Sequence, residues 1–284
     1  MNPEILNQLG RGDPVNLQPV GGGCIAQARI ATFADGYRVF IKTAEGLPGM
    51  FACEAEGLSA LAAADAIRIP EVLLVGDGEL VLEAIVSGPK RPDFFEAFGR
   101  QFARLHGHQG PYFGFASDNF IGSTAQPNTP VGEGDDWAGF FLERRLRFQA
   151  EMAEENGHGS ELRSLLENGE NRIAELLAAA PDPPGLLHGD LWGGNYMVDD
   201  QGKPCLIDPA VYYGHREADL AMTRLFGGFT PAFYSAYEEA WPLEPGHADR
   251  LPLYQLYHLL NHLNLFGSAY YSQCRQILSR FARK

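Results

Sequence analysis

The chain has 284 residues, of which 22 are basic and 36 acidic, and a formal net charge of −14 at pH 7. Such an acidic surface repels nucleic acids and anionic membranes, so we expect neither as a partner. An apolar fraction of 45% is ordinary for a folded globular protein and excludes intrinsic disorder. The sequence shows no apolar run of membrane-spanning length and no secretory signal at its start, and its four cysteines lack CxxC spacing. We therefore expect a cytoplasmic protein with free thiols, without a disulfide framework or a zinc site.

The first part of the chain predicts a small antiparallel β-rich lobe with one main helix. Runs rich in β-branched and aromatic residues, separated by glycine turns, predict strands. An apolar stripe at helical spacing predicts a helix over residues 50–64. Because the pattern becomes helical from Asp93 onward, we expect two lobes, residues 1–88 and 89–284. The expected strands are residues 15–20, 24–33, 37–42, 70–75 and 79–85.

A run of three glycines, Gly21, Gly22 and Gly23, lies between the first two expected strands. Glycines in such a turn let backbone N–H groups approach a phosphate without a Cβ in the way. The run matches neither GxxxxGK[ST] nor GxGxxG. A plain hairpin turn therefore remains an equal interpretation.

Lys42 ends an expected strand in which it shares one face with Phe40. A lysine turned inward from a strand is costly unless anionic groups face it. Glu54 shares the apolar stripe of the following helix, an anomalous place for an acid, and is the natural partner. We predict that the two side chains pair and hold phosphate. The alternative is a strand-end lysine that reaches into water beside a solvated glutamate.

The last strand of the first lobe leads into a crossover, where backbone groups at residues 82–85 can hydrogen-bond the edge of a planar ligand. Beyond it, alternating apolar and charged residues predict a mostly helical second lobe. Residues 107–134 predict a loop region, and residues 196–198 and 205–207 predict short strands around a turn. The expected helices are residues 94–108, 137–155, 161–180, 216–226, 231–241 and 251–271.

The most specific motif lies in residues 186–208. His188, Asp190 and Asn195 fall in the pattern HxDxxxxN, and a short hairpin and an apolar-Asp-Pro step follow and place Asp208. This spacing matches the catalytic loop and the metal-binding carboxylate of kinase-like phosphotransferases. Asp190 can orient an attacking hydroxyl and accept its proton, while Asn195 and Asp208 offer hard oxygen ligands to Mg²⁺ on ATP phosphates. The structural alternative is a buried His and Asp that only hold a loop in place.

The segment after Asp208 favours a small acceptor. Protein kinases place a long activation segment after their metal-binding aspartate. Here only seven residues separate Asp208 from Arg216, where we expect the next helix to begin. This leaves no room for a peptide-docking platform, although a sugar that projects from a protein lysine could still enter.

The combination of motifs resembles the fructosamine kinase (ketosamine 3-kinase) family over nearly the whole chain. The most particular matches are HGDLWGGN at residues 188–195 and IDPAVYYGHREADLAM at residues 207–222. Further matches are GGGCI (21–25), VFIK (39–42), MFACEAEGLSAL (50–61), VLE (81–83), DNFIG (118–122), FLERRL (141–146) and LYHLLNHLNLFGSAYY (256–271).

The resemblance implies an α+β, bilobal protein-kinase-like fold that uses ATP and Mg²⁺. It further implies phosphorylation of the 3-hydroxyl of a ketosamine, either a small molecule or a glycated amine on a protein lysine, as a deglycation repair step. The roles that it implies are a base at Asp190, metal ligands at Asn195 and Asp208, phosphate contacts at Lys42 and Glu54, adenine-facing residues at Glu83, Ala84 and Ile85, and substrate contacts at Trp192 and His215.

Several alternatives stay open at this point. The chain could phosphorylate another hydroxyl compound, such as an aminoglycoside or choline, or could be a nucleotide-binding pseudokinase scaffold; turnover separates these. The sequence does not decide which sugar is preferred, whether the substrate is free or bound to a protein, or whether the chain forms a homodimer.

His258 and His262 stand four residues apart on a helix but lack the acid of HExxH, so packing is the favoured interpretation. Cys24 follows the glycine run, and we hypothesise that its oxidation impairs ATP binding or bridges two chains, although an inert strand cysteine is the simpler interpretation.

Overall fold

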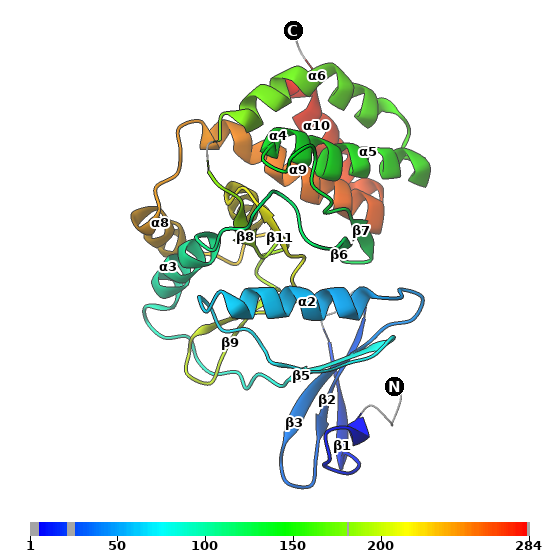
Figure 1. Ribbon diagram of the computed structural model, residues 1–284, viewed down its shortest axis with the longest axis vertical. Coiled ribbons are helices and arrows are strands. Elements are labelled where there is room, and N and C mark those ends of the chain that lie inside the picture. The colour runs from blue at the N-terminus through cyan, green and yellow to red at the C-terminus, as the bar shows by residue number, and fades with distance from the viewer. Residues whose placement is uncertain (1–5, 22–25, 181, 283–284) are drawn as a thin grey trace.

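Five antiparallel strands form the sheet of the N-terminal lobe, in the order β1-β2-β3-β5-β4. The computed structural model describes residues 6–21, 26–180 and 182–282. Figure 1 shows this sheet at one end of the molecule and the helices gathered at the other, so the predicted bilobal α+β fold is confirmed. The strands are β1 (Asn16–Val20), β2 (Gln27–Thr32), β3 (Arg38–Thr43), β4 (Val72–Val75) and β5 (Glu79–Glu83).

The two faces of the sheet follow from the alternation of side chains along β3. Val39 and Ile41 are fully buried on one face, against a cluster that includes Val81. Phe40 points to the other face and packs against the cluster of helix α2 (Met50–Ala63). Figure 1 shows α2 lying across the sheet, between it and the second lobe. The predicted alternation is confirmed, and it places Lys42 on the face that looks toward the second lobe.

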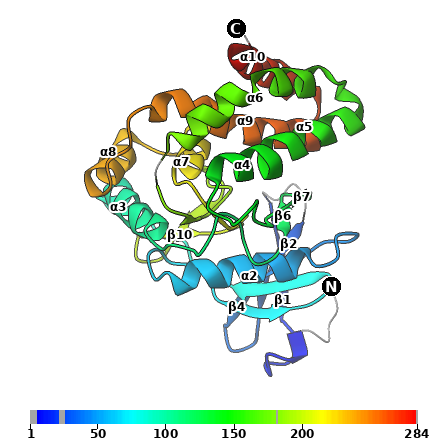
Figure 2. The ribbon, with the colours of Figure 1, turned by 45° about the horizontal axis from the view of Figure 1, so that its top comes forward.

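The second lobe is built mainly from helices, arranged as Figure 2 shows. Helices α3 and α8 pack side by side, and so do α6 and α10. The segment expected as one helix over residues 137–155 is a continuous run of short α-helical and π-helical turns. The helices are α3 (Phe94–His106), α4 (Trp137–Phe141), η1 (Leu142–Arg147), α5 (Phe148–Ala153), η2 (Glu154–His158), α6 (Glu161–Ala178), α7 (Glu217–Leu225), α8 (Pro231–Ala240), α9 (His247–Phe266), η3 (Ser268–Tyr270) and α10 (Tyr271–Phe281).

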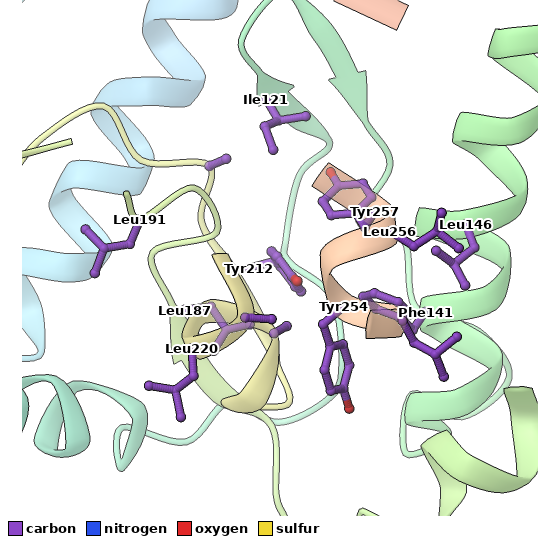
Figure 3. Packing of buried hydrophobic residues seen from close by; sticks show 14 of the residues in the cluster. Ile121, Phe141, Leu146, Leu187, Leu191, Tyr212, Leu220, Tyr254, Leu256 and Tyr257 are labelled. Atoms are coloured by element: carbon purple, nitrogen blue, oxygen red, sulfur yellow. The ribbon is translucent and has the colours of Figure 1, made fainter. Parts of the chain in front are cut away.

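One continuous hydrophobic cluster fills the second lobe (Figure 3). Tyr212 packs there with Tyr254 and Tyr257 of α9 and with Phe141 of α4, and all four side chains are almost completely buried. Leu187, immediately before the catalytic motif, belongs to the same cluster. The core therefore reaches the backbone on which the candidate site is built.

Short strand pairs, which are hard to recognise in a sequence, shape the inner surface of this lobe. They are β6 (Asn119–Ile121) with β7 (Thr124–Gln126), β8 (Gly185–Leu187) with β11 (Tyr212–Gly214), and β9 (Tyr196–Val198) with β10 (Pro204–Leu206).

The β6–β7 hairpin lies in the segment expected to be a loop and joins the two lobes. Its Phe120 packs against the cluster of α2, whereas Ile121 packs into the core of the second lobe. Just before it, the Ser117 hydroxyl donates to Glu56 Oε2 of α2 at 2.6 Å. Helix α2 is thus held in place by a hairpin from the other lobe.

The C-terminal end of the chain also differs from the expectation. A single helix was expected over residues 251–271, but α9 begins earlier, at His247, and ends at Phe266. Gly267 follows with φ 92°, a conformation that glycine adopts without strain and that stops the helix. Among the helices of the described residues, none has the length and apolarity needed to cross a membrane.

Candidate active site

The HxDxxxxN pattern, residues 188–195, forms a loop between β8 and β9. Asn195 Nδ2 donates to the backbone oxygen of Asp190 at 2.8 Å and to its Oδ2 at 3.1 Å. These bonds fix the Asp190 carboxylate and leave the amide oxygen of Asn195 as a ligand atom. Burial and the nearby Asp208 carboxylate raise the pKa of Asp190 well above its ordinary value.

The loop lies flush against the segment that follows Asp208. Gly189 has φ 82°, and a Cβ there would come within 1.9 Å of the Ala210 backbone oxygen. The Ala210 amide donates to the His188 backbone oxygen at 2.8 Å, and His188 Nε2 donates to the Ile207 backbone oxygen at 2.9 Å. Only glycine combines this conformation with this approach, and the consequence is that Asp190 and Asp208 share one site.

Asp219 of α7 holds the loop from beneath. Its fully buried carboxylate accepts the backbone N–H groups of His188 at 2.7 Å and of Gly189 at 2.8 Å. His106 Nε2 lies 3.2 Å from the same carboxylate. Burial alone would raise the pKa of Asp219, but these hydrogen bonds outweigh it and lower the pKa.

We expect the substitution Asp219→Asn to destabilise the protein by about 2 kcal/mol and to lower kcat, because an amide nitrogen would face buried N–H donors. Thermal unfolding and steady-state turnover measure the two effects. Asp249→Asn, at an exposed acid in the first turn of α9, is the matched control and should change neither. An Asp219→Asn variant with unchanged stability and turnover would contradict this role.

Lys42 is brought together with two carboxylates. Its Nζ lies 2.7 Å from Glu54 Oε1 and 2.8 Å from Asp208 Oδ1. The side chains of Lys42 and Glu54 are only 11% and 12% exposed. Burial would lower the pKa of Lys42, but the two facing carboxylates outweigh it and raise the pKa. The lysine is therefore a fixed cation at this point of the site.

Asp208 adopts an uncommon backbone conformation, with φ 54°. Among residues with a side chain, aspartate and asparagine tolerate this left-handed region best. One oxygen of its carboxylate binds Lys42, which leaves the other available to a cation. The conformation aims the carboxylate at the lysine of the opposite lobe.

A cavity of about 410 Å³ lies between the lobes and collects most of the residues that the sequence singled out. Gly22, Gly23 and Cys24 lie outside the described residues. The predicted site residues that line the cavity are Gly21, Lys42, Glu54, Glu83, Ala84, Ile85, Asp190, Trp192, Asn195 and Asp208.

The crossover after β5 forms one wall of this cavity. Arg68 Nη2 donates to Glu83 Oε1 at 2.6 Å, and the Glu83 backbone N–H donates to the Glu71 backbone oxygen. Leu82, Ala84 and Ile85 also line the cavity, with Met197 and Ile207 from the second lobe. A planar ring could therefore lie between apolar side chains, beside the backbone of the crossover.

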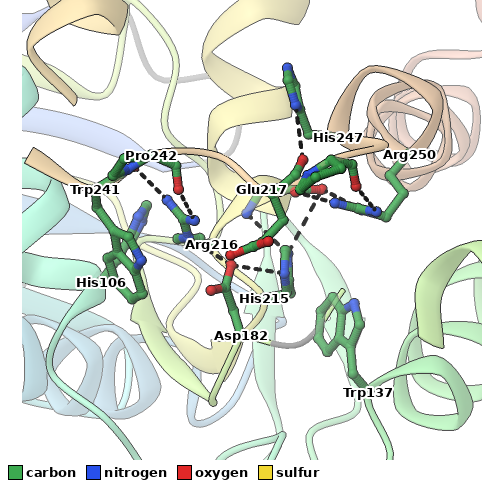
Figure 4. A network of polar contacts seen from close by, with 12 residues as sticks. His106, Trp137, Asp182, His215, Arg216, Glu217, Trp241, Pro242, His247 and Arg250 are labelled. Atoms are coloured by element: carbon green, nitrogen blue, oxygen red, sulfur yellow. Dashed lines mark hydrogen bonds and ion pairs between the residues drawn. The ribbon is translucent and has the colours of Figure 1, made fainter. Parts of the chain in front are cut away.

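His215 does not reach the cavity, and the expectation that it contacts substrate is corrected. Its side chain is fully buried, with Nε2 3.1 Å from Asp182, and its ring stacks on Tyr254 at 6.0 Å between centroids. Figure 4 shows it in a polar network with Arg216 and Glu217. Its proximity to Asp208 in the sequence was misleading, because the chain turns into the core through β11.

His262 was missed as a cavity residue, although its neighbour His258 was correctly interpreted as packing. His258 is buried, and burial lowers its pKa to about 3. His262 lines the cavity, and its Nδ1 donates to the His258 backbone oxygen at 2.8 Å. Within the described residues, no three His, Cys, Asp or Glu side chains gather as a metal site. Helical periodicity alone could not separate the two histidines, since the cavity borders the core.

The donor set of the cavity fits magnesium on a nucleotide. Asn195 and Asp208 both line it, and each keeps an oxygen that is not engaged by the neighbours described above. Amide and carboxylate oxygens are the ligands that Mg²⁺ takes in phosphoryl-transfer sites, where phosphate oxygens and waters complete the shell.

A β-rich lobe with a Lys–Glu pair, facing a helical lobe with an oriented aspartate and two oxygen ligands, defines a kinase-like phosphotransferase. Comparison with known proteins identifies the family: the fructosamine kinase family model matches residues 2–284. The chain belongs to the fructosamine kinase family.

Individual relatives agree with this assignment. A protein named as a probable ketoamine kinase from Synechocystis sp. is 40% identical over 98% of this chain and 96% of its own length. The chloroplastic protein-ribulosamine 3-kinase of Oryza sativa subsp. japonica is 40% identical over 93% of this chain and 78% of its own length. A crystal structure from Haemophilus somnus 129PT, provisionally named a fructosamine-3-kinase, superposes with a TM-score of 0.87 at 29% identity, covering 99% of this chain and 96% of that one.

The fold is shared more widely. An ADP-bound aminoglycoside phosphotransferase superposes with a TM-score of 0.63 at 11% identity, covering 99% of this chain and 98% of that one. At this identity the likeness shows the fold alone.

Proposed function

We propose that this protein transfers the γ-phosphoryl group of ATP to the 3-hydroxyl of a ketosamine. Its family and the names of its relatives support a ketosamine acceptor. The observation that carries the proposal is the convergence of Lys42, Glu54, Asp190, Asn195 and Asp208 on one cavity. A pseudokinase scaffold would not need all five.

Asp190 acts on the acceptor hydroxyl. Its carboxylate lines the cavity and is held by Asn195, so that it can accept a hydrogen bond from the hydroxyl and take its proton as the phosphoryl group transfers. Its raised pKa makes it a better proton acceptor than an ordinary carboxylate.

The opposite side of the cavity binds phosphate. Lys42 is kept charged and oriented by Glu54 and can contact phosphate oxygens. Asn195 and Asp208 would hold Mg²⁺, which neutralises phosphate charge when bound. Adenine lies along the crossover at Glu83, Ala84 and Ile85, and Gly21 lies on the phosphate side.

The acceptor end of the cavity suits a small molecule that carries a sugar. Trp192 is 39% exposed and lines the cavity, as does His262 from α9. Sugars commonly lie against aromatic faces while polar groups bind their hydroxyls. The segment after Asp208 enters β11 and then α7 directly, without a docking platform for a peptide.

The proposal carries the remaining expectations with it. The phosphorylated ketosamine is unstable and loses its sugar, so the reaction is a deglycation step on a free amine or on a protein lysine. We place the reaction in the cytoplasm and the boundary between the lobes at residue 88, with neither nucleic acid nor membrane as a partner.

ADP release from Mg·ATP tests the proposal against a panel of acceptors: fructosyl-, ribulosyl- and erythrulosyl-lysine, kanamycin, choline and glucose. We expect turnover with the ketosamines alone and none in an Asp190→Ala control. Turnover only with kanamycin or choline would move the chain to another acceptor class. ATP binding without turnover on any acceptor would favour the scaffold.

A further inference from the structure

Arg68 lies outside the cavity, in the link between α2 and β4, and binds two other segments of the chain. Its Nη2 lies 2.6 Å from Glu83 Oε1 at the crossover, and its Nη1 lies 3.0 Å from Asp199 Oδ2 in the β9–β10 turn. Asp200, beside Asp199, is 3.5 Å away. One planar guanidinium thus joins the first lobe, the crossover and the second lobe.

The backbone of Arg68 makes a further connection. Its carbonyl accepts the Leu206 amide at 2.9 Å, and the residue forms a parallel bridge with Cys205. Strand β10, held in this way, leads directly to Ile207 and Asp208. Two residues after Arg68, Pro70 already lines the cavity.

The β9–β10 turn is held by hydrogen bonds within it and lies close to the crossover. Asp199 is only 3% exposed, and its Oδ1 accepts the amides of Gln201 at 2.9 Å and Lys203 at 2.8 Å. A Cβ on Gly88 would lie 2.8 Å from the Asp199 backbone oxygen. The carboxylate that binds Arg68 is therefore fixed independently of Arg68.

The segments that Arg68 joins supply the walls around the position proposed for adenine. These walls are formed by Ala84 and Ile85 of the crossover, by Met197 of strand β9 and by Ile207, which follows β10. Arg68 itself does not line the cavity. Its contacts set the spacing between walls that belong to different lobes.

We propose that Arg68 is a positioning residue for the base-binding part of the cavity, and this inference rests on the proposed use of ATP. The Arg68 and Glu83 side chains are 34% and 36% exposed, so their ion pair contributes little to global stability. The buried Asp199 carboxylate keeps the amides of Gln201 and Lys203 as hydrogen-bond donors when Arg68 is lost. The buried clusters of both lobes form without it. Loss of Arg68 therefore affects nucleotide affinity more than folding.

The test measures the Kd of adenosine and of ADP by calorimetry for the full chain and for Arg68→Gln. Adenosine has no phosphates, so a change in its Kd reports the base and ribose walls alone. We expect both ligands to weaken by the same factor, roughly three- to tenfold, with kcat at saturating ATP within about twofold. Arg68→Lys, which cannot bridge two carboxylates in the same geometry, should lie between wild type and Arg68→Gln.

Arg104→Gln is the matched control. Arg104 Nη2 donates to the Ala66 backbone oxygen at 3.1 Å, in the same link, but reaches neither the crossover nor the β9–β10 turn. It should leave the Kd of adenosine unchanged. Glu83 itself lines the cavity, so its contact with Arg68 is tested by the pair of changes: the loss of adenosine affinity in the double variant of Arg68→Gln and Glu83→Gln should be smaller than the sum of the losses in the two single variants.

The outcomes separate this inference from the function on which it rests. A wild-type chain that binds neither ADP nor adenosine would overturn both. Wild-type binding with an unchanged Kd in Arg68→Gln would overturn the role of Arg68 and leave the proposed function intact. Equal weakening in Arg104→Gln would assign the effect to general loosening of the link and would also overturn it. Should Arg68→Gln fail to fold, the Kd of adenosine in Arg68→Lys decides by the same criterion.

Discussion

Asparagine in place of Asp190 should lower kcat by roughly 10³-fold, within the range that general bases contribute, while ADP binds as before. The shape of the side chain is kept, and Asn195 can still donate to its oxygen. Only the ability to take a proton from the acceptor hydroxyl is lost. Single-turnover kinetics with a ketosamine, together with ADP titration, measures both quantities.

The same variant should be at least as stable as the wild type in metal-free buffer at neutral pH. The pKa of Asp190 is raised by burial and by Asp208, so its ionised form costs stability above the pKa of the unfolded chain. Asparagine removes that cost, and the gain should shrink as pH falls from neutral toward about 4, the ordinary pKa of an aspartate, and should be absent below it. Thermal unfolding in EDTA, measured over a range of pH, gives the difference in stability between the variant and the wild type.

Two results would contradict the role of Asp190. Turnover at the wild-type rate in Asp190→Asn would exclude it as the base. Loss of ADP binding along with turnover would mean that the substitution disturbs the site as a whole. Asp249→Asn, at an exposed carboxylate of α9, is the control for a change of one charge and should retain activity.

Asp208→Asn should abolish the magnesium dependence of nucleotide binding and lower kcat/KM for Mg·ATP by more than about 10³-fold. Asparagine tolerates the left-handed backbone at this position, so the variant tests the charge and not the fold. Lys42 keeps its partner Glu54 at 2.7 Å. Calorimetric titration of ADP with and without Mg²⁺ gives the binding difference, and ADP release gives the rate.

A variant that still binds ADP more tightly with Mg²⁺ than without it would refute Asp208 as a metal ligand. Unfolding of the variant would instead mean that the ion pair with Lys42 is structural. Thermal unfolding of Asp208→Asn beside Asp249→Asn distinguishes these two outcomes.

The part of the site that could be predicted from the sequence depends only on the spacing of residues within one strand or one helix. The alternation around Lys42 and the position of Glu54 on the apolar stripe of α2 placed these side chains on facing surfaces, and the structure brings them within 2.7 Å. Each inference needed only the period of one strand or one helix. The two lobes followed in the same way from the change of period near residue 93.

What could not be predicted depends on contacts between segments far apart in the chain. His215 lies close to Asp208 in sequence, yet β11 carries it into the core. Arg68 shows no periodicity that would connect it with Asp199, and the β6–β7 hairpin consists of strands too short to give a pattern. His262 differs from His258 only in which surface its side of α9 meets.

The attachment of α2 to the β6–β7 hairpin has a consequence for how far the helix that carries Glu54 can move. Phe120 and the Ser117–Glu56 hydrogen bond hold the helix that carries Glu54, and the chain passes from Asp208 into β11 and α7 without a segment that could swing away. Protein kinases are switched by displacing the equivalent helix and by reordering such a segment. In the described residues, α2 is held in place by the hairpin, and no such segment follows Asp208. We therefore expect the Lys42–Glu54 pair to be in place before a nucleotide binds.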